Sequence, residues 1–308
     1  MSSPAPLDVP SASDASPTEK PPPLDGWRGD PGGLAALRKE LDRLDDVLHD
    51  TLIKRAEVIE RVAKTGKPAA YRPGREAAII RRLLARHSGS MPPHVVVRIW
   101  RELLAGTTAM QGGFAVAVCQ ADAAAGFIQA AREHFGALSP VHVHRSPAQA
   151  IAEVSAGTAS VAVLPMPSET EPPRAAWWTA LLHRDSPRIH IVARLPFWMR
   201  RPEGALGVQA LVIAPAAPDP SGRDCSLLGL ELDLDVSRAR LTAAVTASGF
   251  TPGTIILRRD AGAQVAHALI EVEGFLAEDD ARLVGIATAL RPPVILGAYA
   301  VPEEGGAA

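Results

Sequence analysis

The chain has 308 residues, of which 47% are hydrophobic and 21% charged, a composition typical of a globular protein with two or three compact units. Its formal net charge of −2 gives no reason to expect nucleic acid or an anionic membrane as a general partner. Two cysteines, Cys119 and Cys225, stand in unrelated contexts. They argue against a disulfide scaffold or a cysteine-based metal site, and favour a reduced, cytoplasmic setting.

The first thirty residues are rich in proline and serine and predict a disordered tail. They lack the basic start and apolar centre of a secretory signal. The chain also has no apolar run of the roughly twenty residues that a membrane-spanning helix needs.

After the tail, apolar residues recur with the 3.6-residue period of helices as far as about Gln111. Breaks at glycine and proline predict three helices: Leu34 to about Thr65, Arg75 to His87, and His94 to about Gln111. The expected apolar sides of the second and third helices are Ile79, Ile80, Leu83 and Leu84, and Val95, Ile99, Leu103 and Thr107. The first helix, roughly 45 to 50 Å long, is too long to be covered by its own chain, which predicts an intertwined dimer.

One face of the first helix carries arginines among its apolar residues. The face is formed by Leu34, Arg38, Leu41, Asp45, Leu48, Leu52, Arg55, Ile59 and Val62. A buried guanidinium is costly unless an anion meets it, so Arg38 and Arg55 indicate either a solvated helix edge or a built anion site.

From Phe114 the pattern changes to short β-branched runs that alternate with helical stretches. This βαβαβ order favours a parallel sheet, followed by a tryptophan-containing helix and a further strand. The expected elements are strands at 114–119, 141–145, 160–164 and 188–193, and helices at 122–135, 146–156 and 174–183, with Ser146 as a helix cap and Pro147 at the first helical position.

The last hundred residues have a βαββαβ order, which suggests a small ferredoxin-like module. The expected strands are 206–214, 254–258, 265–272 and 294–300, and the expected helices are 237–248 and 279–290. The predicted organisation is a tail (1–30), an all-α three-helix domain (31–112), an α/β domain (113–200) and the βαββαβ module (201–308).

Three segments of the helical region, LAALRKELDRLDDVLHDTLIKRAEVIERVAK, YRPGREAAIIRRL and RIWRELLAGTTAMQ, resemble the all-helical class of chorismate mutase. The resemblance covers about eighty residues, from Leu34 to Gln111. It places the substrate-binding and catalytic positions of that family on Arg38, Arg55, Arg75, Glu76, Thr107 and Gln111.

The resemblance implies the rearrangement of chorismate to prephenate in aromatic amino-acid biosynthesis, with no cofactor. This pericyclic step needs orientation and electrostatic stabilisation rather than a nucleophile or an acid/base pair. It implies that Arg38, supplied across the dimer, and Arg55 hold the two substrate carboxylates. Gln111 would donate to the ether oxygen, and Glu76 would accept from the ring hydroxyl. Arg75 and Thr107 would complete the polar wall.

One departure concerns the family's lysine, which belongs eleven residues after Arg55, where this chain has Gly66. Lys67 is the candidate replacement, because it follows a helix-breaking glycine and could reach the site. Arg72 is a second departure, since it stands where the family often has an acidic residue.

Each of these positions also has a simple structural explanation. The chain has 27 arginines and five lysines, so a single Arg38 or Arg55 is more often a solvated helix edge. Glu76 could merely complement the dipole of its helix. The joint spacing of six positions over three helices favours the site. The histidines of this region, His49, His87 and His94, have no metal-ligand spacing, so no metal is expected.

The second half resembles, without a strong motif, a reduced prephenate dehydratase followed by an amino-acid-binding regulatory (ACT-like) module. Where dehydratases have a catalytic Thr-Arg-Phe segment, the nearest equivalent in this chain is Leu195, Pro196 and Phe197. Where the regulatory module of that family has its Glu-Ser-Arg-Pro effector signature, this chain has LRRDA at 257–261. We therefore expect no dehydratase activity and a structural or partner-docking role for this half. Two alternatives are a bifunctional mutase/dehydratase and a non-enzymatic protein that senses an aromatic amino acid or binds a partner.

Overall fold

The computed structural model describes residues 31–65, 71–122, 126–183, 187–201 and 207–305. The chain divides into two compact units, Met1–Ala56 and Glu57–Ala308. Helix α1 (Pro31–Ala63) begins in the first unit and ends in the second. It is one continuous helix, because after residue 33 it contains neither glycine nor proline.

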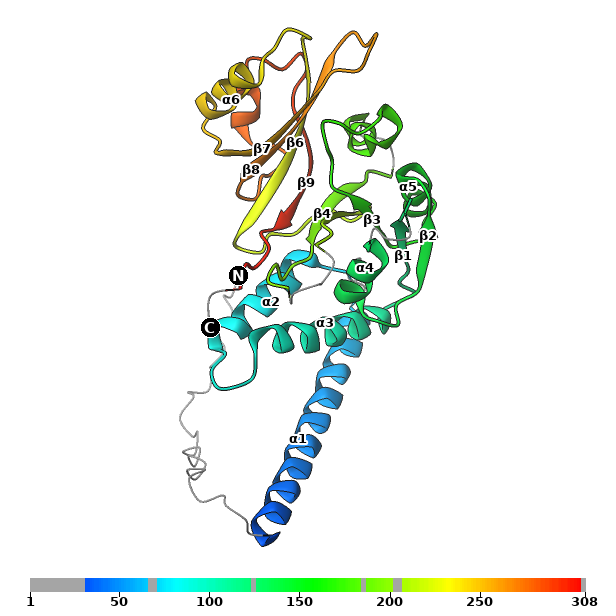
Figure 1. Cartoon of the computed structure of the whole chain (residues 1–308), viewed down its shortest axis with the longest axis vertical. Coiled ribbons are helices and arrows are strands. Elements are labelled where there is room, and N and C mark those ends of the chain that lie inside the picture. The colour runs from blue at the N-terminus through cyan, green and yellow to red at the C-terminus, as the bar shows by residue number, and fades with distance from the viewer. Residues whose placement is uncertain (1–30, 66–70, 123–125, 184–186, 202–206, 306–308) are drawn as a thin grey trace, which may run out of the picture. The chain divides into compact units, whose positions relative to one another are not determined.

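Helices α2 (Pro73–Arg86) and α3 (Pro93–Ala109) confirm the other two predicted helices, and each starts at a proline. The buried sides differ in part from those expected. Helix α3 buries Val97, Arg101, Leu104 and Thr108, whereas Ile99 is exposed. The buried face of α3 differs from the expected one because α3 packs against α4 as well as α2 (Figure 1).

Nine strands form one mixed sheet with the order β2-β1-β3-β5-β4-β9-β6-β8-β7. Its first half contains β1 (Val116–Cys119), β2 (Val141–His144), β3 (Val161–Pro165), β4 (His190–Leu195) and β5 (Ala210–Ala214). Strands β1, β2 and β3 are parallel, as the βαβαβ order predicts, whereas β5 is antiparallel to β3 and β4.

Both faces of the first half of the sheet are covered by helices. Helix α4 (Phe127–Phe135) lies on one side with Tyr71, where the core includes Val116, Val118 and Val163. On the other side lie helix α5 (Pro147–Ser155) and the 3-10 helix η3 (Trp177–His183), which follows the 3-10 helix η2 (Pro173–Ala175). Ser146 caps α5 by accepting from the Gln149 backbone N–H, as expected.

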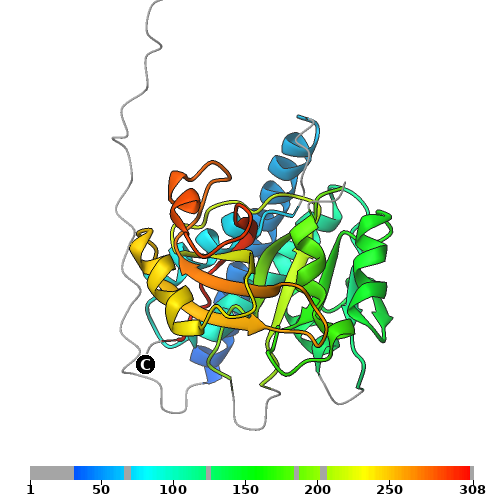
Figure 2. The same cartoon turned by 90° about the horizontal axis from the view of Figure 1, so that it is seen from above.

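The second half of the sheet contains β6 (Asp224–Leu232), β7 (Pro252–Arg258), β8 (Ala266–Glu273) and β9 (Val294–Ala300). Helix α6 (Arg238–Ala247) covers one face of these strands through Leu241 and Val245 (Figure 2). The connection between β8 and β9 contains only the 3-10 helix η4 (Ala281–Gly285).

Four expectations need correction. The helix predicted at 174–183 is two 3-10 helices, in which the buried Trp177 and Trp178 donate to the Pro165 carbonyl and to Glu171. The helix predicted at 279–290 is only η4. Strand β5, expected to open the C-terminal module, lies between β3 and β4 instead. Strand β6 lies instead at the start of the C-terminal strands, where no strand was predicted.

One β-bridge pair, Ile191 with Gly297, links β4 to β9 between the two halves of the sheet. A side chain at Gly297 would place its Cβ 1.9 Å from the Ile191 carbonyl oxygen, and the backbone there has φ +148°. Only glycine permits this approach of the two strands.

Candidate active site

Arg38 and Arg55 both lie on α1, in the first unit. Arg38 is exposed and Arg55 is partly buried, and burial lowers the pKa of Arg55. The large apolar side chains of the same helix are also exposed along its length: Leu34, Leu37, Leu41, Leu44, Val47, Leu48, Ile53, Val58 and Val62. The arginines therefore stand within an apolar surface that α1 exposes.

The start of α2 is fixed by a carboxylate 145 residues further along the chain. Asp219 accepts hydrogen bonds from the backbone N–H groups of Gly74 (2.9 Å) and Arg75 (3.1 Å), and it pairs with Arg72 (3.2 Å). A Cβ on Gly74 would lie 2.0 Å from the Asp219 carbonyl oxygen, so this contact requires glycine. The arrangement caps the helix and places Arg75 in solvent and Glu76 in the interior.

Glu76 is 8% exposed and forms an ion pair with Arg101, which is 4% exposed, at 3.1 Å. The same Arg101 nitrogen lies 3.5 Å from His134 Nε2, and Tyr71 Oη lies 3.3 Å from that Nε2. Arg101 also stacks over the Phe197 ring at 4.9 Å. Since Arg101 can only donate, we assign His134 as neutral with Nε2 as the acceptor.

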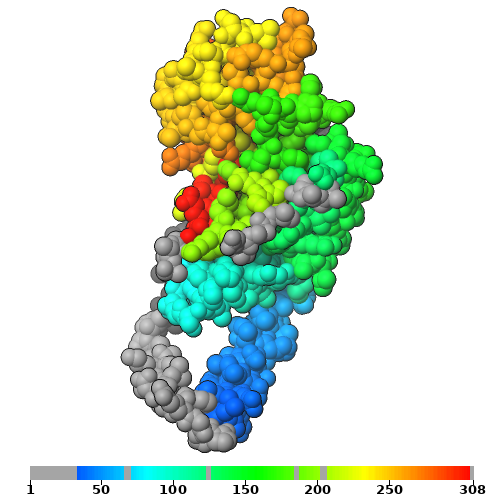
Figure 3. All heavy atoms as spheres, in the orientation of Figure 1, coloured from blue at the N-terminus to red at the C-terminus, as the bar shows by residue number. Residues whose placement is uncertain are grey.

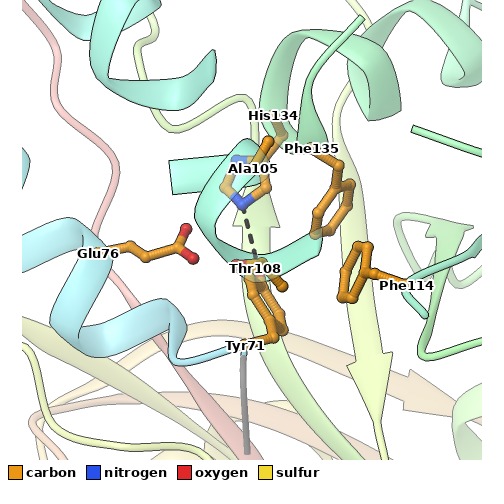
Figure 4. Close-up of a pocket in the computed structure, with 7 residues that line it drawn as sticks. All are labelled: Tyr71, Glu76, Ala105, Thr108, Phe114, His134 and Phe135. Atoms are coloured by element: carbon orange, nitrogen blue, oxygen red, sulfur yellow. Dashed lines mark hydrogen bonds between the residues drawn. The ribbon is translucent and has the colours of Figure 1, made fainter. Parts of the chain in front are cut away.

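These side chains surround a cavity of about 10 Å³, room for one water molecule (Figure 4). Its lining residues are Tyr71, Glu76, Ala105, Thr108, Phe114, His134 and Phe135. Thr108 faces the cavity, whereas Thr107 does not line it. Figure 3 shows the surrounding elements: α2 and α3, in cyan, lie directly against the green lobe that supplies His134 and Phe135.

Burial shifts the proton affinities of this cluster. Desolvation raises the pKa of Glu76 to about 7; Arg101 opposes the rise and Asp219 adds to it. Burial and the charge of Arg101 hold the pKa of His134 well below its usual value. Desolvation also raises the pKa of Tyr71. Glu76 therefore titrates near neutral pH, beside a histidine that stays uncharged.

Thr107 and Gln111 are half-buried, but α3 ends at Ala109, so Gln111 lies in the turn after the helix rather than within it as the sequence predicted. Thr107 Oγ1 donates to the Leu104 carbonyl (2.8 Å), and Gln111 Nε2 donates to the Thr107 carbonyl (3.1 Å). The Gln111 amide keeps its second N–H and its oxygen for a ligand.

The second unit thus holds Arg75, Glu76, Thr107 and Gln111, whereas Arg38 and Arg55 belong to the first. Lys67 lies outside the described residues. The sequence reasoning missed Arg101, His134 and Tyr71. A signal for Arg101 was present, because 97, 101, 104 and 108 repeat the helical spacing, with an arginine among apolar residues.

Residues 37–112 match the family model described as chorismate mutase type II. This segment is similar to the type II chorismate mutases. Two curated relatives are bifunctional chorismate mutase/prephenate dehydratases, from Pseudomonas aeruginosa (30% identical over 151 residues) and Stutzerimonas stutzeri (28% over 147 residues). Each match covers 45% of this chain and 40% of the relative.

Solved structures with a similar arrangement include GqqA, described as a novel type of quorum quenching acylase, with 17% identity and a TM-score of 0.47. The match covers 63% of this chain and 97% of the GqqA chain. The prephenate dehydratase from Streptococcus mutans has 16% identity and a TM-score of 0.45, and covers 61% of this chain and 98% of that one. A third, from Arthrobacter aurescens in complex with L-Phe, has 13% identity and a TM-score of 0.43, covering 62% and 93%.

Among the described residues, no helix is long and apolar enough to span a membrane. In the same part of the chain, no three His, Cys, Asp or Glu side chains are grouped so that they could hold a metal ion.

Proposed function

We propose that the chain catalyses the rearrangement of chorismate to prephenate in aromatic amino-acid biosynthesis. The observation that carries this proposal is the match of residues 37–112 to the chorismate mutase type II model. The reaction forms one carbon–carbon bond while the ether C–O bond breaks, with no proton transfer. The protein must therefore hold the compact diaxial conformer and stabilise the charge that develops on the ether oxygen.

In the proposed site, Arg55 and the Arg38 of a second copy hold the two substrate carboxylates. Arg38 is exposed and Arg55 is partly buried, and neither forms an ion pair among the described residues, which supports this role. Arg75 and Thr107 complete the polar wall. Lys67 is proposed as the cation at the ether oxygen.

Gln111 is proposed to donate to the ether oxygen, where charge increases in the transition state. Its bond to the Thr107 carbonyl holds the amide against the last turn of α3, which supports this role. Glu76 is proposed to accept from the ring hydroxyl. This role requires an ionised carboxylate, since a protonated Glu76 is the weaker acceptor.

The active form is proposed to be a dimer through α1. Its exposed leucines at 34, 37, 41, 44 and 48 have alternating spacings of three and four, which suits another helix with the same repeat. A second copy supplies that helix and also brings Arg38. The C-terminal half is proposed to be non-catalytic, with β6 to β9 and α6 forming an ACT-like module.

The test is loss of chorismate absorbance with the purified full-length protein. Turnover is expected from the wild type, and a fall in kcat/KM of about 100-fold or more from Arg55→Ala and from Gln111→Ala. Arg61→Ala, an exposed arginine on the same helix outside the proposed site, should retain activity. No turnover by the wild type, or equal activity of all three variants, overturns the proposal.

A second candidate is a bifunctional mutase/dehydratase, favoured by the names of the two curated relatives. Formation of phenylpyruvate from added prephenate by the same preparation would establish it. A third candidate, a non-enzymatic sensor of an aromatic amino acid, requires amino-acid binding without mutase turnover.

A further inference from the structure

The proposed reaction leaves one buried charge next to its site residues without a role. Arg101 lies on α3, is 4% exposed and pairs with Glu76 at 3.1 Å. A buried guanidinium is costly even when it is paired, and an apolar side chain of similar size would avoid that cost. Its partner Glu76 is the residue proposed to accept from the ring hydroxyl of the substrate, so the two side chains are considered together.

Side chains from four parts of the chain face Glu76. Arg101 of α3 donates to Glu76 Oε2. His134 of α4 and Tyr71, which precedes α2, line the same small cavity as Glu76 (Figure 4). Asp219 binds the backbone N–H groups at the start of α2. Of these groups, Arg101 is a cation and Asp219 an anion, whereas His134 is neutral and burial keeps Tyr71 protonated by raising its pKa.

Arg101 and Asp219 act on the protonation of Glu76 in opposite directions. Burial favours the neutral acid, Arg101 favours the carboxylate and Asp219 favours the acid, and the pKa of Glu76 lies at about 7 as a result. Without Arg101, Glu76 would be mostly protonated at neutral pH. A protonated Glu76 is the weaker acceptor for a hydroxyl group.

The region after β4 holds Arg101 in place. The guanidinium lies over the Phe197 ring at 4.9 Å, and its Nη1 lies 3.5 Å from His134 Nε2. Phe197 is 5% exposed, and its carbonyl accepts from the Glu303 backbone N–H at 2.7 Å. The Glu303 carboxylate in turn pairs with Arg81 of α2 at 2.6 Å. Phe197 is therefore fixed between the two helices and the end of the chain.

We propose that Arg101 is a positioning residue of the mutase reaction. It keeps the Glu76 carboxylate ionised and oriented for the ring hydroxyl, and Phe197 holds Arg101 in the geometry that this requires. The inference rests on the proposed function, because it uses the role given to Glu76 there. It gives the C-terminal half a part in the reaction, since Phe197 and Asp219 act on Glu76 without contact with the substrate.

The pH dependence of kcat/KM of the full-length protein tests this role. In Arg101→Met, the acid limb of the profile should move to higher pH by about one unit or more, because Glu76 loses its counter-charge. The loss of kcat/KM should be about fivefold or more at pH 7 and smaller at pH 9, where Glu76 is again ionised. Arg101→Lys restores the charge and should return the limb towards its wild-type position.

The matched control is Arg98→Met, an exposed arginine on the same helix, which should keep the wild-type profile. Equal losses at pH 7 and pH 9 in Arg101→Met overturn the proposal, because a purely structural role lowers activity at every pH.

Asp219→Asn gives a shift of the opposite sign and keeps the proposal testable if Arg101→Met does not fold. The change removes a negative charge near Glu76 and retains an oxygen that can accept from the start of α2. The acid limb should move to lower pH. A limb that stays in place or moves to higher pH overturns the proposal.

A titration that needs no turnover separates this inference from the proposed function. In protein labelled with [δ-13C]glutamate, the carboxyl signal that is missing from Glu76→Gln reports the pKa of Glu76 by NMR. This pKa should be higher in Arg101→Met and lower in Asp219→Asn than in the wild type. Unchanged values overturn the inference whether or not chorismate is turned over. Shifted values with no turnover by the wild type overturn the proposed function, and the positioning role falls with it.

Discussion

Helix α1 and the α2–α3 pair come from the same matched segment, yet they cover their apolar surface in different ways. Helices α2 and α3 bury Ala77, Ile80, Val97 and Leu104 in a core that includes Phe197 and Ala300 of the following region. Helix α1 leaves a run of leucines exposed. The difference teaches that α2 and α3 are held by this chain's own C-terminal half, whereas the apolar side chains of α1 stay exposed and are available for the proposed dimer.

The strongest test of the α2–α3 side is Arg101→Met. The change leaves Glu76 buried without its counter-charge, and the free energy of unfolding should fall by about 3–5 kcal/mol. Urea denaturation measures it, with the exposed Arg98→Met as control, expected within about 0.5 kcal/mol of the wild type. Adding Glu76→Leu to Arg101→Met should recover most of the loss. A small effect of Arg101→Met would mean that water reaches the Glu76–Arg101 pair.

The α1 side is tested by Leu41→Lys. A charge within the exposed leucine run should weaken the proposed dimer at least about 100-fold in Kd, because an unpaired ammonium cannot be buried at the helix–helix contact. Sedimentation equilibrium measures the change. Asp42→Lys introduces the same side chain one position further round the helix and should leave the dimer intact. Equal effects of both changes, or a monomeric wild type, would contradict the comparison.

The protonation of Glu76 should make the proposed reaction depend on pH. Its raised pKa of about 7 means that the carboxylate becomes protonated as the pH falls through neutrality. The value of kcat/KM should therefore be about tenfold lower at pH 6 than on the alkaline plateau. Glu76→Gln should lower the plateau and flatten the profile. A wild-type profile that stays level from pH 5 to pH 8 would remove Glu76 from the site.

The smallest effect is expected at the start of α2. Asp219→Ala removes the acceptor for the Gly74 and Arg75 N–H groups and should destabilise the protein by about 1 kcal/mol. Asp233→Ala, an exposed aspartate outside this contact, is the control. Thermal unfolding measures both. A loss no greater than that of the control would show that water replaces the cap without cost.

The helices and most strands could be predicted because their periodicity is local. Strand β6 was missed because the sequence at 224–232 is rich in leucine and poor in β-branched residues, so nothing local marks it as a strand. Its strand conformation comes from pairing with β8 and β9.

In the candidate site too, some residues could be predicted from the sequence and others could not. The family spacing indicated Glu76, Thr107 and Gln111, but the residues that surround Glu76 and fix the start of its helix could not be predicted. His134 lies 58 residues beyond Glu76 along the chain and Asp219 binds the start of α2 from 145 residues away, and no periodic pattern reports such long-range contacts.

The junction of β4 with β9 at Ile191 and Gly297 has a practical consequence for truncation. Removal of the chain from β6 onward would turn β4 into the edge of a sheet, with its backbone groups unpaired and the buried Ile191 and Leu195 close to solvent. Such an edge is a template for pairing with other molecules. A shortened protein prepared to isolate the helical segment together with the first half of the sheet should therefore aggregate.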